Sequence, residues 1–135
     1  PAAGFVGVAG AVVIGIIVAV VCFFMVSVVK HKFGYDDSLD AFGVHGIGGI
    51  IGALLTGFLA TPAVQSSYSG LFYGNPKQLW IQFIATVATI AFSGIMTFIL
   101  YKIVDSMVGI RATHKEEIAG LDISQHNEMA LAESD

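Results

Sequence analysis

Charged side chains are scarce in this sequence, and cysteine is rarer still. Only 12% of the 135 residues are Asp, Glu, Lys or Arg, and the six basic residues are scattered along the chain. No basic stripe exists that could follow a phosphate backbone, so we expect no nucleic-acid partner. The one cysteine, Cys22, excludes an internal disulfide, and its place in an apolar run is typical of a small buried hydrophobe.

Apolar residues dominate instead. They make up 56% of the chain, and the mean hydropathy is +0.82. A soluble core of this size could not hide that much apolar surface, so the composition predicts an all-α membrane protein. The first apolar run lacks a basic leader and a cleavage site, which argues against a signal peptide. We expect the chain to be the carboxyl-terminal part of a longer protein.

Three apolar runs are long enough to cross a membrane, at about residues 4–29, 41–60 and 79–104. We expect residues 1–105 to form a transmembrane region and residues 106–135 a cytoplasmic tail. Lys30, His31 and Lys32 follow the first run, and a short basic loop is typical of the cytoplasmic side. Three spans then place the carboxyl terminus inside the cell as well.

The second run carries a single histidine, His45, among many glycines. An imidazole inside a membrane segment is costly, and it indicates a functional site by default. The alternative is a core histidine that bonds a neighbouring helix. We expect Ser38 or Asp40 to cap the start of this helix. At α-helical spacing one small, weakly polar face gathers Ala41, His45, Gly48, Gly49, Gly52 and Thr56.

The third run carries a ridge of small residues spaced by four. The ridge is either a contact with another helix or part of a pore wall. It consists of Ala85, Thr89, Ser93 and Thr97. An intramembrane enzyme is disfavoured, because Ser93 and His45 lie on different runs without an orienting carboxylate. The spacing of His31, His114 and His126 supports no metal site, and nothing in the sequence indicates a cofactor.

The stretch from Asp37 to Gly49 reads Asp-x-x-Asp-x-Phe-Gly-x-His-Gly-x-Gly-Gly. It resembles the penultimate transmembrane helix of the ammonium transporter family (the Amt/Mep/Rh group), and the bacterial Amt branch fits best. The start of the chain, residues 1–6, is similar to that family's ninth span. Residues 109–111 and 120–122 are similar to its cytoplasmic tail. The resemblance therefore covers nearly the whole chain.

This resemblance implies an architecture. The family protomer has eleven spans, built from two inverted five-helix repeats and a final long helix, and it assembles as a homotrimer in the cell membrane. This chain would supply spans nine to eleven, surrounded by lipid and by the remaining helices of the same transporter.

The resemblance also implies roles for residues. His45 matches one member of a pore histidine pair, Ala41 would line the inner pore, and Asp40 would have a structural role at the helix start. The implied activity is ammonium transport for nitrogen uptake. Ammonium loses its proton at the outer mouth, ammonia crosses an apolar lumen, and the histidine pair moves the proton. Burial disfavours the imidazolium, and a neutral ring offers one donor and one acceptor nitrogen.

In the tail, Arg111, Glu117, Gly120 and Asp122 match positions that the family uses to fold an inner-face element and to dock a PII-type signal protein. Otherwise a tail of this composition is typical of solvated disorder. The family often closes with His-Gly-Glu-x-Ala-Tyr, whereas residues 126–131 read His-Asn-Glu-Met-Ala-Leu. An ammonium sensor of the same fold, signalling through this tail, is the alternative to a transporter.

Overall fold

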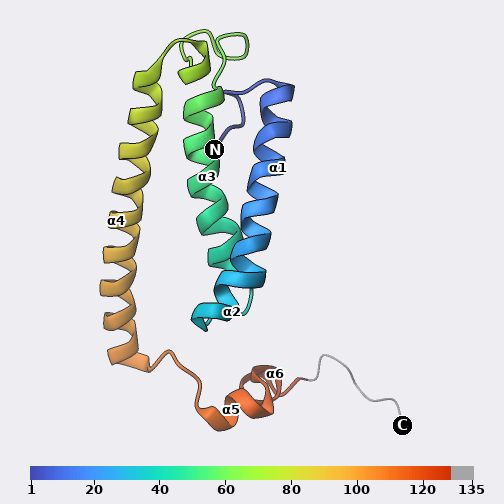
Figure 1. The fold of residues 1–135 in the computed structure, drawn as a ribbon. Coiled ribbons are helices and arrows are strands. Elements are labelled where there is room, and N and C mark those ends of the chain that lie inside the picture. Colours follow the sequence, from blue (N-terminus) through green and yellow to red (C-terminus); the bar gives the residue numbers. More distant parts are fainter. Residues whose placement is uncertain (129–135) are drawn as a thin grey trace. The chain divides into compact units, whose positions relative to one another are not determined.

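The computed structural model describes residues 1–128, and every regular element in that range is a helix (Figure 1). Three helical segments are long and apolar enough to cross a membrane: Val8–Phe33, Phe42–Leu59 and Pro76–Val108. This confirms the predicted all-α membrane fold with three long apolar helices. The segment 126–131, which departs from the closing motif given above, extends past the described range, and its last three residues lie outside it.

The first segment is a continuous helix that changes its winding near the end. It consists of α1 (Val8–Phe24), a π-helical turn η1 (Met25–Val29) and α2 (Lys30–Phe33). Helical backbone satisfies its own hydrogen bonds, which is what an apolar run needs when no water is present. Cys22 is buried, as the sequence predicts.

The second segment runs beside the first in the opposite direction (Figure 1). It begins with a π-helical turn η2 (Phe42–Gly46) and continues as α3 (Ile47–Leu59). The helices approach closely because glycine leaves room: a Cβ at Gly48 would lie 3.2 Å from the sulfur of Cys22. Small residues at such contacts are the usual means of helix packing in membranes.

Residues 60–75 connect the second and third segments and include a short 3-10 helix, η3 (Leu71–Tyr73). The Thr61 amide donates to the Phe5 carbonyl at 2.8 Å, which ties this connection to the amino-terminal residues. The ring of Phe5 also meets Tyr68 edge-on, with centroids 5.6 Å apart. The loop is therefore part of the same packed unit as α1 and α3.

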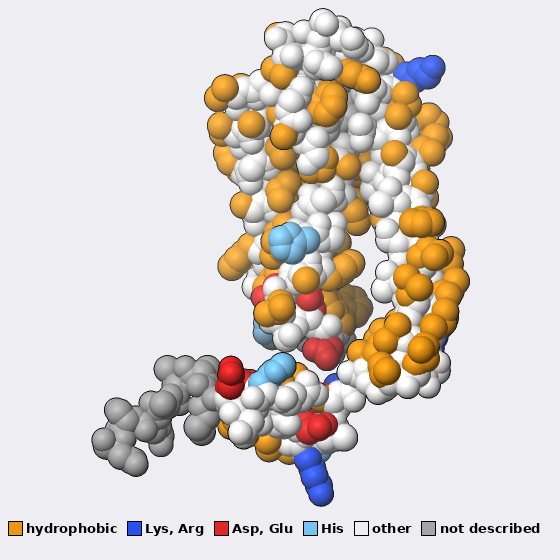
Figure 2. Space-filling view, turned by 180° about the vertical axis from the view of Figure 1, so that it is seen from behind, with side chains coloured by type: hydrophobic (Ala, Val, Ile, Leu, Met, Phe, Trp, Pro, Cys, Tyr) orange, Lys and Arg blue, Asp and Glu red, His pale blue; other side chains and the backbone are white. Residues whose placement is uncertain are grey.

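The third segment, α4 (Pro76–Val108), spans a division of the chain into two compact units, residues 1–92 and a second unit from Ser93 onward. Nothing in α4 is buried within the described residues. Large apolar side chains such as Phe92 are exposed, and hydrophobic side chains cover much of the long helices on the face drawn in Figure 2. Such a surface suits lipid or further helices.

Two short helices follow in the second unit, α5 (His114–Ala119) and α6 (Leu121–His126), and they contact each other. Gly120 lies between them with φ +89°, a conformation that L side chains rarely adopt. Residues 114–119 and 121–126 are thus helical. The composition of the tail alone is also typical of solvated disorder.

Candidate functional site

His45 stands in the π-helical turn η2, and its side chain is exposed. Its ring makes no hydrogen bond to any residue in the range 1–128. The alternative of a core histidine bonded to a neighbouring helix therefore has no counterpart within the described residues. Both ring nitrogens, one a donor and one an acceptor in the neutral ring, are thus unused among residues 1–128.

The π turn decides which way His45 faces. The Ile47 amide donates to the Phe42 carbonyl, five residues earlier, instead of four as in an α-helix. This spacing places Gly43 below Gly48 on the side that packs against the first segment. A Cβ at Gly43 would lie 2.8 Å from Cγ2 of Val26, and one at Gly48 would lie 3.4 Å from Cγ1 of Val18.

The single small face predicted from α-helical spacing is therefore wrong. Gly52 and Thr56 are buried in the packed side of α3, but Ala41 and His45 are exposed. The physical reason is the extra residue in the π turn, which changes the register so that Gly43, not His45, meets the first segment. Ala41 and His45 remain one turn apart.

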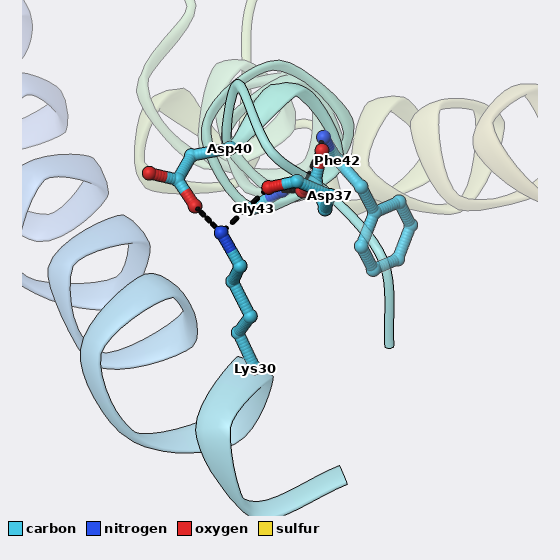
Figure 3. Close-up of polar contacts among 5 residues, drawn as sticks. All are labelled: Lys30, Asp37, Asp40, Phe42 and Gly43. Carbon is cyan, nitrogen blue, oxygen red and sulfur yellow. Dashed lines mark hydrogen bonds and ion pairs between the residues drawn. The ribbon is translucent and has the colours of Figure 1, made fainter. Parts of the chain in front are cut away.

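Asp37, Asp40 and Lys30 hold the start of this helix (Figure 3). The Asp37 carboxylate accepts hydrogen bonds from the amides of Phe42 at 3.0 Å and Gly43 at 3.3 Å. The Asp40 carboxylate is 2.6 Å from the Lys30 ammonium. The expectation that Ser38 or Asp40 caps the helix is thus wrong, because the Asp40 side chain turns to Lys30 and leaves the amides to Asp37.

Two hollows lie in the first unit, away from His45. One, of about 170 Å³, is lined by residues that include Pro1, Phe5 and Thr56. The other, of about 440 Å³, lies between α3 and the start of α4 and includes Phe58 and Trp80. Neither of these two hollows is lined by His45.

The members of the predicted ridge on the third run are exposed. Exposure fits a helix contact and a pore wall equally. The Thr89 hydroxyl donates to the Ala85 carbonyl of its own helix at 2.8 Å. Either role for the ridge stays a prediction.

In the tail, the structure joins two of the four predicted residues. Arg111 and Glu117 form an ion pair at 3.1 Å. Gly120 provides the turn between α5 and α6, and Asp122 lies in the first turn of α6. Glu117 and Asp122 thus belong to the two tail helices, whereas Arg111 precedes α5 and Gly120 separates α5 from α6.

Thr113 and Glu116 were missed at the level of sequence, although they form a capping box at the start of α5. The Thr113 hydroxyl and amide both donate to the Glu116 carboxylate at 2.7 Å, and the Glu116 amide donates back to the hydroxyl at 3.4 Å. The hydrogen bond from the Thr113 hydroxyl is the main cause of a lowered pKa of Glu116, and the bond from the Thr113 amide adds to it. The Thr-x-x-Glu pattern is a recognised helix-start signal that could have identified them.

Lys30 and Asp37 were also missed as parts of the site. A lysine directly after an apolar run and an acidic cluster a few residues later indicate a pair, but not which carboxylate the lysine reaches. No group of three metal-binding side chains occurs in the part of the chain that the structure describes.

Comparison with known proteins places this geometry in context. The sequence model of the Ammonium Transporter Family matches residues 1–131. An ammonium transporter of Bacillus subtilis is 50% identical over 135 residues, which are 99% of this chain and 33% of the relative. One of Aquifex aeolicus is 50% identical over 130 residues (96% and 30%), and ammonium transporter Amt1 of Archaeoglobus fulgidus is 48% identical over 131 residues (96% and 33%). The chain spans about a third of the length of these relatives.

Proposed function

The chain belongs to the ammonium transporter family, and from this premise we propose that it forms part of a membrane passage for ammonium and ammonia. The observation that carries the proposal is the exposed His45 imidazole, which lies on a membrane-length helix. Three spans cannot enclose a passage alone, so the remaining walls belong to the rest of the transporter.

His45 acts as a neutral imidazole at the edge of this passage. Its acceptor nitrogen receives a hydrogen bond from an N–H of ammonia or ammonium, and its other nitrogen bonds a second histidine outside this chain. A bare cation is costly to desolvate in an apolar lumen, whereas neutral ammonia gives up only a few hydrogen bonds. Ammonium therefore loses its proton at the outer mouth, and the histidine pair carries that proton separately.

Ala41 lies one turn before His45 and is exposed as well. A methyl side chain leaves the passage open at this level and offers no polar group that would retain the substrate. Asp40 contacts no substrate in this scheme; its ion pair with Lys30 holds the cytoplasmic end of the helix.

The remaining assignments follow the family architecture. Residues 1–105 are spans nine to eleven of an eleven-span, inverted-repeat protomer in the cell membrane, and the protomer assembles as a homotrimer. Residues 106–135 lie in the cytoplasm. The helical part of that tail, with Arg111 and Glu117 paired, is a docking surface for a PII-type signal protein.

The test is His45→Ala in a full-length transporter that carries these residues. Losing a hydrogen bond to the migrating species is worth about 1 kcal/mol or more, so we expect ammonium uptake or the ammonium-induced current to change about fivefold or more. His31→Ala, an exposed histidine at the end of the first segment, is the matched control. Size-exclusion chromatography checks that the oligomer is intact.

Unchanged uptake together with unchanged current in His45→Ala would remove His45 from the mechanism. The same experiment separates transport from sensing. A wild-type protein that gives no uptake in cells lacking their own ammonium transporters, while still signalling through the tail, would favour the sensor.

A further inference from the structure

The start of the His45 helix is held by residues that contact no substrate in the proposed transport mechanism. We propose that Lys30 is a positioning residue for His45, acting through Asp40 and Asp37 on the π turn that carries the imidazole. The inference rests on the function proposed for His45, but different atoms carry it and they are tested separately.

The first link is the Lys30 ammonium itself. It donates to the Asp40 carboxylate and to the Asp37 backbone carbonyl, each at 2.6 Å (Figure 3). That carbonyl also accepts the Asp40 amide at 3.0 Å, which closes the turn. One side chain from the end of the first segment thus fixes both ends of the turn that precedes the second.

The second link runs from this turn into the helix. The Asp37 carboxylate accepts the amides of Phe42 and Gly43, which belong to the π turn itself. The Asp40 carbonyl accepts the Val44 amide at 2.9 Å, one residue before His45. The two aspartates therefore bond three successive amides directly below the imidazole.

The backbone conformation of Asp40 explains why the turn at residues 37–40 depends on Lys30. Its φ is +55°, in the left-handed region that is unfavourable for a residue with a Cβ. Strained backbone of this kind persists where surrounding contacts hold it, and the ion pair with Lys30 is the side-chain contact that does so. Without Lys30, the turn is free to relax and to move the amides of residues 42–44.

The expected signature is local. The side chains of Lys30 and Asp40 are 23% and 35% exposed, and ion pairs near a surface add little to global stability. A purely structural role would lower the stability of the whole protein or leave it unchanged. A positioning role disturbs residues 42–46 and transport, and leaves the rest of α3 as it is.

The first experiment is hydrogen exchange on the full-length transporter with Lys30→Met. We expect the amides of residues 42–46 to exchange about tenfold faster, and those of residues 50–59 to change less than about twofold. An arginine at this position can still donate to both acceptors of Lys30, so Lys30→Arg should restore exchange to within about threefold of the wild type. Lys32→Met removes an exposed lysine two residues away and is the matched control.

Equal exchange of residues 42–46 in wild type and Lys30→Met would overturn the proposal. So would the same acceleration in Lys32→Met, because the effect would then be one of general charge. Acceleration spread evenly over both segments would also overturn it, since that reports global destabilisation.

The second experiment measures transport in the single variants and in the Lys30→Met/His45→Ala double variant. If Lys30 acts through His45, Lys30→Met should lower the maximal rate severalfold alone and change it less than about twofold in the His45→Ala background. Losses that multiply would overturn the proposal. If His45→Ala alone leaves transport unchanged, the function proposed for His45 fails, and the exchange experiment alone decides the role of Lys30.

Discussion

At the start of the His45 helix and at the start of the short helix α5, a carboxylate accepts hydrogen bonds from backbone amides. The two carboxylates come from different places in the chain. At the His45 helix, Asp37 belongs to a preceding loop that Lys30 ties to the first segment. At α5, Glu116 lies inside the helix that it caps and pairs with Thr113, three residues earlier.

The difference shows what each helix start depends on. The capping box at α5 is complete within four residues, so it forms wherever the local sequence is helical. The start of the His45 helix needs two segments to be packed together, because Gly43 must meet Val26 and Lys30 must meet Asp40. A change in the first segment can therefore reach His45, whereas the capping bonds of α5 lie within residues 113–116.

Gly43→Ala should disrupt the packing of the His45 helix against the first segment and give the largest effect. The added Cβ would lie 2.8 Å from Cγ2 of Val26, whose branched side chain has little freedom to move. Overpacking of this kind costs about 1–3 kcal/mol, only partly offset by the better helix propensity of alanine. Thermal unfolding of the purified protein measures the loss.

Gly49→Ala is the matched control, because a Cβ at Gly49 would meet nothing within 4 Å. It should leave the unfolding midpoint unchanged or raise it slightly. Equal midpoints for the two variants would mean that the close approach at Gly43 does not hold the π turn in place.

Asp37→Ala tests the hydrogen bonds at the start of the His45 helix. It leaves the amides of Phe42 and Gly43 without their acceptor, and loss of a helix cap costs about 1 kcal/mol. We expect faster hydrogen exchange at residues 42–46 and no change in α5. Ser38→Ala is the control, since α-helical reasoning made Ser38 a candidate cap and the structure gives that role to Asp37. A loss in Ser38→Ala equal to that in Asp37→Ala would contradict this assignment.

These two helix starts also explain what could be predicted from the sequence. The three spans were predictable because a long apolar run is a local signal, and His45 stood out because it is the one ionisable side chain in the middle run. The Thr113-x-x-Glu116 box was equally local and could have been identified in the same way.

The π turn and the choice of cap were not predictable on these grounds. Both depend on residues far apart in sequence, Gly43 on Val26 and Asp40 on Lys30, which meet only when the segments pack. Extrapolating the α-helical period through residues 42–46 therefore grouped His45 with Gly52 and Thr56. The single change of register separates the exposed imidazole from the packed face.

Lowering the pH tests the start of α5, and we expect the smallest effect here. Because its hydrogen bonds to Thr113 lower the pKa of Glu116, this carboxylate stabilises α5 fully above the pKa of an unfolded glutamate. The contribution is lost as the pH falls through the lowered pKa. We expect the carbon chemical shifts of residues 114–119 to move toward coil values in that range. Glu116→Gln can still close the capping box but does not titrate, so its α5 should keep the same shifts over this range; a Gln variant that loses helix in acid as the wild type does would assign the transition to another group.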